Sequence, residues 1–149
     1  MKLLDADTVE NMTDTNNPVV TPIACALPNR PPGSPKMFGT DPVEVVPGTR
    51  LRALVGNQTL STDYFCNYGV NEEYAARFEQ AGFRVSARGA NGETRAMELD
   101  GQRFYIATLF QPQLASTAER PHPVITAYIR ECVAFANERA GRSAEASSA

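Results

Sequence analysis

The feature that most constrains the fold is a nearly continuous apolar run at residues 104–110, which has the sequence Phe-Tyr-Ile-Ala-Thr-Leu-Phe. A strand with one wet face alternates apolar and polar residues, whereas a run of this kind is typical of a strand buried on both faces of a sheet. We therefore predict a central strand at 104–110, with Ile106 and Leu109 pointing into packed layers on opposite faces. Such a strand needs a neighbouring strand on each edge.

A hairpin is predicted just before this strand, at residues 83–99. Residues 83–89 alternate as a strand does, and Asn91-Gly92 is a strong signal for a hairpin turn. The return strand is predicted to have the sequence Thr-Arg-Ala-Met-Glu-Leu, at residues 94–99.

The clearest helix is predicted at residues 71–81. Asn71 is a good N-cap, and Gly82 is placed to end the helix. Three residues at spacings of four and three share one face: Tyr74, Phe78 and Ala81.

A second helix is predicted from Pro123 to about Arg139, because proline is favoured in a first turn. Four residues at helical spacing are expected to form its buried stripe: Val124, Tyr128, Cys132 and Phe135. The small polar residues at 140–149 indicate a disordered tail. The folded domain is therefore expected to comprise residues 1–139.

The first third of the chain is expected to contain long loops. Residues 5–18 are acidic and aperiodic, and residues 29–39 contain three prolines and two glycines. Shorter regular elements are expected around these loops: a buried strand at 19–27, a short strand at 43–46, and one or two helical turns at 51–56.

Composition and charge exclude several classes of function. The net charge is −3 and no basic run is present, which argues against nucleic acid as the main partner. No apolar stretch approaches the roughly 20 residues that a membrane helix needs. The N-terminus becomes acidic at Asp5, which is not the pattern of a signal peptide. We therefore expect a cytoplasmic protein with reduced thiols and no contact with a membrane.

No metal and no cofactor is expected either. The cysteines Cys25, Cys66 and Cys132 are odd in number and widely spaced, which fits neither a disulfide framework nor a zinc site. The acidic segment at 5–14 lacks the ligand spacing and the glycine of a calcium-binding loop.

Several motifs resemble the class I glutamine amidotransferase domain of CTP synthase. The segment FYIATLFQPQL, followed by RPHPVITAYIRECVAFA, is similar to the end of that domain, where a buried strand runs into Phe-His-Pro-Glu-Phe and Arg-Pro-His-Pro opens a terminal helix. Upstream, YGVNEEYAARFEQAGF resembles the family's Tyr-Glu-Val-Asn segment and the helix that follows it. GTDPVEVVPGT and ADTVENMTDTNNPVV resemble two earlier stretches. The resemblance covers residues 5 to about 137.

The chain is also similar to proteins described only as related to the CTP synthase C-terminal region. The resemblance implies an α/β fold, namely the C-terminal half of a flavodoxin-like class I glutamine amidotransferase domain. A mixed sheet would then contain the strand at 104–110 and the hairpin at 83–99, with helices at 71–81 and 123–138 packed on it. By the family's spacing, the first half of the domain is not encoded in this sequence.

The chemistry that the family performs needs residues that this chain lacks. Glutamine hydrolysis uses a cysteine nucleophile, a histidine base and a carboxylate that orients the histidine. The resemblance places the family's histidine and glutamate at Gln111 and Gln113, whose amides do not titrate near neutral pH. The Gly-x-Cys-x-Gly elbow that carries the nucleophile is absent from the sequence. At the family's substrate-binding Arg-Tyr pair this chain has Asn67 and Tyr68.

Other residues are alternative candidates for a site. Cys66 lies near a glycine and before a helix, where a thiolate could be stabilised, but a small residue at a strand end is the simpler interpretation. His122, the single histidine, aligns with the His-Pro that starts the family's terminal helix and is expected to be structural. Cys25 and Cys132 are expected to be core residues. Gln111 and Gln113 could bind a ligand at the rim of the former active site, or could be neutral replacements.

Two functional classes follow from these observations. In the first, the chain is a catalytically silent domain that acts as a binding or regulatory module, with a small molecule or a protein as its partner. In the second, it is the C-terminal half of a split or longer enzyme whose nucleophile comes from a missing N-terminal segment. In both, the strand at 104–110 loses neighbours, so we expect self-association or a partner chain that completes the sheet.

Overall fold

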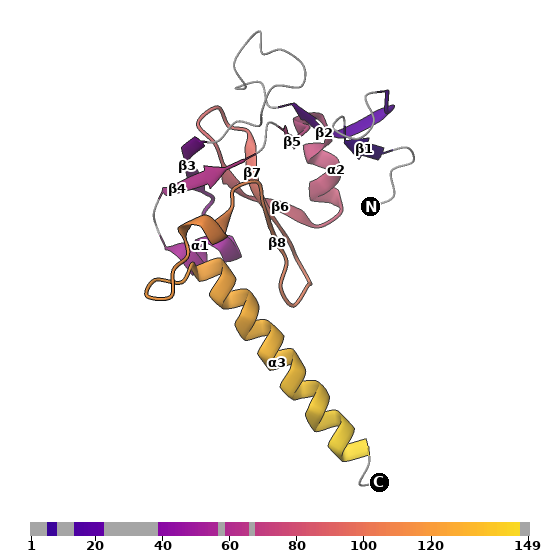
Figure 1. Cartoon of the computed structure of the whole chain (residues 1–149). Coiled ribbons are helices and arrows are strands. Elements are labelled where there is room, and N and C mark those ends of the chain that lie inside the picture. The colour runs from indigo at the N-terminus through magenta and orange to yellow at the C-terminus, as the bar shows by residue number, and fades with distance from the viewer. Residues whose placement is uncertain (1–5, 9–13, 23–38, 57–58, 66–67, 147–149) are drawn as a thin grey trace.

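The computed structural model describes residues 6–8, 14–22, 39–56, 59–65 and 68–146 of the chain (Figure 1). These residues form two sheets, short helices that pack beside them, and one long helix that leads away from both. The last part of the strand expected at 19–27 lies outside the described residues.

Five strands form the larger sheet, which is antiparallel throughout. In spatial order they are β4 (Leu60–Tyr64), β3 (Gly39–Val45), β6 (Phe83–Arg88), β7 (Thr94–Leu99) and β8 (Ile106–Thr108). The sheet curls, so that the segment after β8 comes back to β4, the strand at the opposite end of this order. There the backbone N–H of Gln111 donates to the carbonyl of Asp63 at 2.9 Å.

Three strands form the smaller sheet, which is mixed. β1 (Ala6–Thr8) runs parallel to β2 (Asn17–Pro22), and β2 pairs antiparallel with β5 (Tyr68–Val70). The predicted α/β class is confirmed. Several bounds differ from the predictions, because β1 lies in the loop expected at 5–18 and β3 begins before the strand expected at 43–46.

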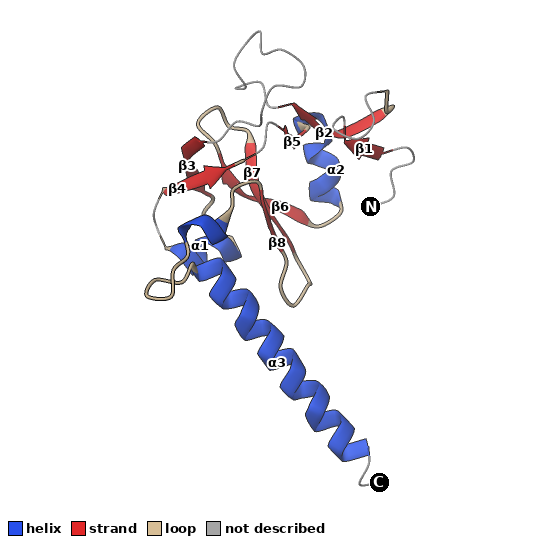
Figure 2. Cartoon of the chain, in the orientation of Figure 1, coloured by secondary structure: helices blue, strands red, loops and turns tan. Residues whose placement is uncertain are grey.

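The helices are separated from the strands by colour in Figure 2. They are α1 (Arg50–Val55), the short turn η1 (Glu72–Tyr74), α2 (Ala75–Gln80), the short turn η2 (Pro112–Ala115) and α3 (Pro123–Ala146). Only the first part of α3 lies against the sheet and α1, and the rest extends away from the body of the molecule (Figure 1).

The core lies between the larger sheet, α1 and the start of α3. Its buried apolar residues are Val43, Val45, Leu51, Ala87, Ala96, Phe110 and Val124. Two groups hold the start of α1 in place over this core. The hydroxyl of Thr49 accepts from the backbone N–H of Arg52 at 3.1 Å, and the carboxylate of Glu98 accepts from the backbone N–H groups of Arg50 and Leu51. A carboxylate is favourable there because a helix N-terminus has unpaired N–H groups and a partial positive charge.

The predicted hairpin is confirmed. Its turn passes through Gly92, whose φ of +83° is a conformation that glycine adopts without strain. In the paired strands Arg84 lies opposite Glu98 and donates to its carboxylate at 2.8 Å. β7 is buried from Thr94 to Glu98, although its sequence contains charged residues.

The predicted helix at 71–81 is confirmed, with η1 as its first turn and α2 as the remainder. The side chain of Asn71 accepts from the backbone N–H of Glu73 at 3.1 Å, which satisfies one of the N–H groups left unpaired at a helix start. Tyr74 is buried, as its position on the apolar face predicts. Gly82 follows the helix with φ of +87°.

The prediction of a central strand at 104–110 is wrong. Only Ile106–Thr108 form a strand, and β8 is the last strand in the order of the larger sheet. Phe110 is buried in the core, but Tyr105 keeps 41% of its surface exposed, and Ile106 and Leu109 are half-buried. An apolar run predicts cover on both faces, and the described residues supply only part of it.

The predictions for the last helix are wrong in two respects. α3 continues to Ala146, so that residues 140–146 of the expected tail are helical. Its expected buried stripe holds only at Val124. Tyr128 and Phe135 are exposed, and so is Cys132, which was expected in the core. These side chains face solvent because the helix leaves the sheet after its first turns (Figure 1).

Candidate functional site

The residues that the family resemblance would make a catalytic pair, Gln111 and Gln113, lie shortly after β8. Gln111 is half-buried, and its backbone N–H is fixed by Asp63 on β4. It stands at the N-cap position of η2, but its side chain does not cap that turn. Gln113 lies inside η2 and is exposed. The curl of the sheet therefore positions both amides beside β4, at the rim of the sheet. The Gln111 amide is not used to hold the turn.

His122 has a structural role at the start of α3. Its Nδ1 accepts from the backbone N–H of Val124 at 3.3 Å, and its carbonyl accepts from the backbone N–H of Thr126. The hydroxyl of Ser116 accepts from the backbone N–H of His122 at 2.9 Å. Partial burial lowers the pKa of His122 below its ordinary value, which favours the neutral ring that this cap requires.

Of the two degenerate positions of the family's substrate-binding pair, only Tyr68 lies within the described residues. Tyr68 begins β5 and is half-buried in the smaller sheet, opposite Pro22 in the register. Asn67, Cys66 and Cys25 lie outside the described residues, so their roles stay predictions.

A hollow of about 200 Å³ adjoins β5, between the smaller sheet and the hairpin. It is lined by Thr21, Pro22, Gly69, Val70, Asn71, Glu72, Glu93 and Thr94. Its two carboxylates already hold the hairpin: Glu72 accepts from the backbone N–H of Thr94 at 2.7 Å, and Glu93 accepts from Asn91 and Arg95. No sequence pattern predicts this hollow, because it depends on the packing of one sheet beside the other.

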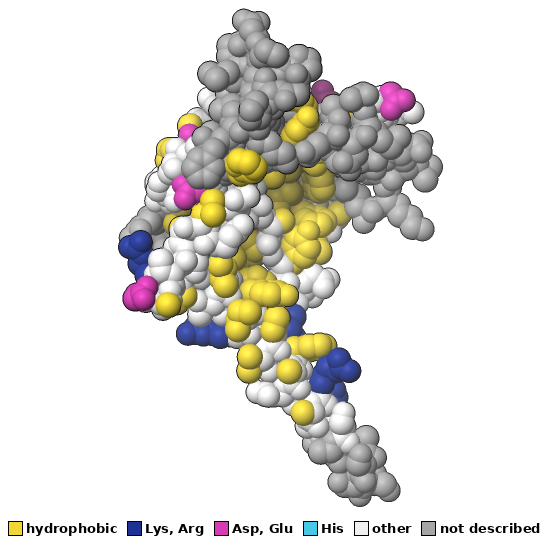
Figure 3. Space-filling model, in the orientation of Figure 1, with side chains coloured by type: hydrophobic (Ala, Val, Ile, Leu, Met, Phe, Trp, Pro, Cys, Tyr) yellow, Lys and Arg dark blue, Asp and Glu magenta, His cyan; other side chains and the backbone are white. Residues whose placement is uncertain are grey.

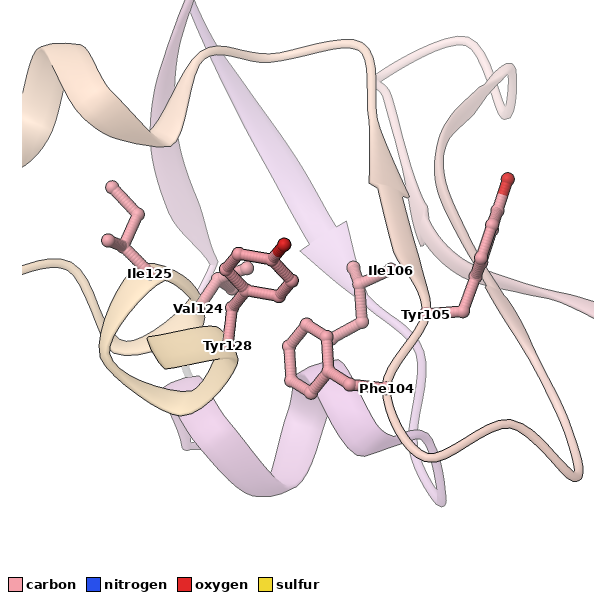
Figure 4. A pocket seen from close by; sticks show the side chains of 6 residues that line it. All are labelled: Phe104, Tyr105, Ile106, Val124, Ile125 and Tyr128. Carbon is pink, nitrogen blue, oxygen red and sulfur yellow. The ribbon is translucent and has the colours of Figure 1, made fainter. Parts of the chain in front are cut away.

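A second hollow, of about 330 Å³, is apolar and opens between β8 and α3 (Figure 4). Its lining residues are Phe104, Tyr105, Ile106, Val124, Ile125 and Tyr128. Phe104 and Ile106 point towards Tyr128, whereas Tyr105 points to the other side of the strand (Figure 4). A hydrogen bond with Cys132 raises the pKa of Tyr128. The lining supplies apolar contact and no carboxylate or imidazole, so this hollow is suited to packing rather than to acid–base chemistry.

The described residues contain neither a metal-binding cluster nor a membrane-spanning helix. No cluster of three or more histidine, cysteine, aspartate or glutamate side chains there could hold a metal ion. Among the described helices, none is long and apolar enough to cross a membrane.

Comparison with known proteins identifies relatives in both sequence and fold. The chain matches no protein-family model. It is 30% identical over 137 residues to the CTP synthase of Cytophaga hutchinsonii, and 30% identical over 135 residues to that of Caldivirga maquilingensis. These matches cover 90% and 89% of this chain, but only 25% and 24% of the relatives. The chain thus spans about a quarter of the length of the CTP synthases that it matches.

A solved structure gives the same result for the fold. The glutaminase domain of Trypanosoma brucei CTPS, with bound acivicin, matches with a TM-score of 0.77 at 22% sequence identity. The match covers 87% of this chain and 51% of that domain's chain. Together, sequence and fold identify this chain as a homologue of the class I glutamine amidotransferase domain of CTP synthase.

Proposed function

We propose that this chain is a catalytically silent amidotransferase-type domain that acts as a binding or regulatory module. The observation that carries the proposal is the pair Gln111 and Gln113, which lies shortly after β8, where the family resemblance implies a histidine and a glutamate. A carboxamide neither takes up a proton near neutral pH nor carries the charge that stabilises an imidazolium.

His122 is a poor substitute for the missing base. Its Nδ1 is occupied by the backbone N–H of Val124 at the start of α3. A general base must lie within hydrogen-bond reach of the group that it deprotonates, and it must have a nitrogen available for the proton. Recruiting Nδ1 would cost the helix one of its capping contacts.

The proposed ligand-binding role rests on the two amides themselves. Each carboxamide has an acceptor oxygen and two donor hydrogens, so the rim beside β4 can recognise a polar small molecule without transforming it. Gln113 is exposed and Gln111 is half-buried, so a ligand can reach both from solvent.

The test is an assay for glutamate release from glutamine by the purified full chain. We expect no release above buffer, because base, orienting carboxylate and elbow nucleophile are all missing. Release that is abolished by Cys66→Ala but retained in the matched control Cys132→Ala would overturn the proposal and make Cys66 a nucleophile. Cys132 suits the control because it is exposed on α3.

A second candidate function is favoured by the length comparison. Because the fold match covers only 51% of the T. brucei glutaminase domain, the nucleophile of an active assembly could be carried by a segment with no counterpart here. In that case the wild-type chain should release glutamate from glutamine when that segment is supplied. Under the silent-domain proposal it should stay inactive under the same conditions, because the amides of Gln111 and Gln113 replace neither the base nor its carboxylate.

A further inference from the structure

We propose that α3 is a dimerisation element, which packs antiparallel against α3 of a second copy of this chain through one uncharged side of the helix. Four residues define this uncharged face: Ile129, Val133, Ala136 and Ala140. They recur at spacings of four, three and four, so their side chains lie one above another along the helix. This role does not depend on whether the site beside Gln111 is silent, because that site lies outside α3.

The far part of α3 stands away from the rest of the described fold (Figure 1). Residues 132–143 are all exposed, and Figure 3 shows hydrophobic side chains on the projecting helix. An isolated helix of about 12 residues is only marginally stable in water, and most helical stability in proteins comes from packing of one side of the helix. A surface that packs on the far part of α3 would therefore stabilise it.

The side of α3 opposite the uncharged face is held by the loop between β7 and β8. The guanidinium of Arg103 in this loop forms ion pairs with Glu131, at 3.7 Å, and with Glu138. Residues two positions apart on an α-helix point about 200° apart, so Val133 and Ala140 face away from these two carboxylates. The loop therefore fixes the direction of α3 and leaves the uncharged face open to solvent.

The other charged residues of α3 do not interrupt this face either. Arg142 lies on the opposite side of the helix, as the two glutamates do. Arg130 and Arg139 lie at the two borders of the face, and the guanidinium of Arg139 is drawn over the ring of Phe135, 5.9 Å from its centre. Among the described side chains of α3, none on the uncharged face would carry a charge into an interface.

The uncharged face is complementary in shape to itself when two copies run antiparallel. Its half nearer the body carries the large side chains of Ile129 and Val133, which keep 54% and 55% of their surfaces exposed. Its far half carries the small, exposed side chains of Ala136 and Ala140. With a twofold axis between residues 134 and 135, Ile129 faces Ala140 of the second copy, and Val133 faces Ala136 of the second copy. Each layer then combines one large and one small side chain, which is how facing positions of packed helices fill space.

A parallel pair would lack this complementarity. Ile129 would then face the same residue of the second copy, and so would Ala140, which crowds one end of the interface and leaves a gap at the other. The body of the molecule lies at one end of α3, so a parallel pair would also bring the two bodies together (Figure 1). An antiparallel pair puts them at opposite ends. The second copy is therefore the occupant that the arrangement of large and small residues favours.

The experiment measures self-association of the full 149-residue chain by analytical ultracentrifugation. A single pair of helices is a small interface and small interfaces associate weakly, so the range should extend from about 1 µM to about 1 mM. We expect a reversible monomer–dimer equilibrium. Hydrogen exchange of the amides at 132–143 should slow as the protein concentration rises, because the dimer holds this part of α3 closed. A chain that stays monomeric over the whole range overturns the proposal.

Two variants test whether the dimer forms through the uncharged face. Val133→Asp places a charge where Ala136 of the second copy packs, and should raise the dissociation constant at least about tenfold. Ala134→Asp adds the same charge at the next position, towards the charged side, and should stay within about twofold of wild type. Both positions are exposed in the single chain, so both variants should melt as wild type does at low concentration. A dimer that Val133→Asp leaves intact, or that both variants weaken equally, is formed through another surface and contradicts the proposal.

An exchange of side-chain sizes tests the antiparallel register. Val133→Ala leaves a gap against Ala136 of the second copy, and Ala136→Val crowds Val133 of the second copy, so each alone should raise the dissociation constant about fivefold or more. The double variant Val133→Ala/Ala136→Val rebuilds the layer with the two sizes exchanged, and should return to within about threefold of wild type. If the losses of the two single variants simply add in the double variant, these residues do not face each other and the antiparallel pair is wrong.

Discussion

β7 and the segment at 104–110 show opposite relations between sequence and burial. β7 has the sequence Thr-Arg-Ala-Met-Glu-Leu and is buried from Thr94 to Glu98, charged residues included. The segment at 104–110 is almost entirely apolar, yet it contributes a three-residue edge strand and the exposed ring of Tyr105. Burial in this chain therefore follows the neighbours of a strand more closely than its hydrophobicity.

The buried charges of β7 are tolerated because each is paired. Arg95 forms ion pairs with Glu93 at 2.9 Å and with Asp41 at 3.5 Å. Glu98 accepts from Arg84 and from two backbone N–H groups at the start of α1. A buried charge costs far more when it lacks such partners. The reverse holds for Tyr105 in the segment at 104–110, because the described residues leave 41% of its surface exposed.

The largest expected effect separates the two strands directly. Ala96→Asp would place an unpaired carboxylate in the core on β7, at a side chain that is 2% exposed. Its cost of several kcal/mol is comparable to a domain's whole stability of about 5–15 kcal/mol, so we expect no soluble folded protein. Ile106→Asp, on the half-exposed edge strand, should fold with a loss of about 1–2 kcal/mol. The measurement is a urea melt of each soluble variant, with Glu119→Ala in an exposed loop as the control.

These two substitutions also test the prediction made from the apolar run alone. Under that prediction, Ile106→Asp should be as damaging as any core substitution. If Ile106→Asp fails to fold, residue 106 is buried in solution by a partner or a second copy. If Ala96→Asp folds normally, the core between β7 and α1 is misplaced.

The next effect concerns the charge that joins β7 to α1. Glu98→Ala would leave the N–H groups of Arg50 and Leu51 without their carboxylate acceptor, and Arg84 with Asp100 as its remaining partner. We expect a loss of about 2–4 kcal/mol in the free energy of unfolding, measured by urea melts. Glu79→Ala, at an exposed glutamate of α2, is the matched control and should change stability by less than about 0.5 kcal/mol. Equal effects of the two substitutions would mean that Glu98 does not hold the helix.

Features of the fold that depend on contacts between residues near in sequence could be predicted, whereas those that depend on distant residues could not. The Asn91-Gly92 turn and the Asn71 cap are local, and both were predicted correctly. The contact between Glu98 and Leu51 joins residues 47 positions apart, and no sequence pattern marks it. The edge position of β8 and the exposed stripe of α3 could not be predicted either. Both depend on which other segments pack against them. Gln111 and Gln113 were found through the family resemblance alone, since nothing in their local sequence marks a site.

A smaller effect is expected from pH, at the start of α3. Burial lowers the pKa of His122 in the folded state, so the unfolded chain binds more protons there as the pH falls. The contribution to stability is therefore present above the ordinary pKa of about 6.5 and is lost as the pH falls through the lower, folded value. Urea midpoints measured from pH 7.5 to pH 5 should show this loss. It should be absent from His122→Asn, because asparagine keeps a capping acceptor and does not titrate. An unchanged slope in that variant would assign the pH dependence to other groups.

The smallest expected effect is that of Gln111→His. This variant tests whether the side chain of residue 111 contributes to stability. The contact that fixes residue 111 is made by its backbone N–H with Asp63, and its side chain does not cap η2. Any side chain of similar size should therefore fit, and we expect the free energy of unfolding to change by less than about 0.5 kcal/mol. By the family resemblance the variant restores a histidine base, but a base without a nucleophile and an oxyanion site leaves little of a triad's rate. We expect no glutamate release from glutamine. A loss of more than about 1 kcal/mol would show that the amide of Gln111 has a structural partner. Glutamate release by this single variant would show that a nucleophile is already present in the chain, and Cys66 would be the first residue to test.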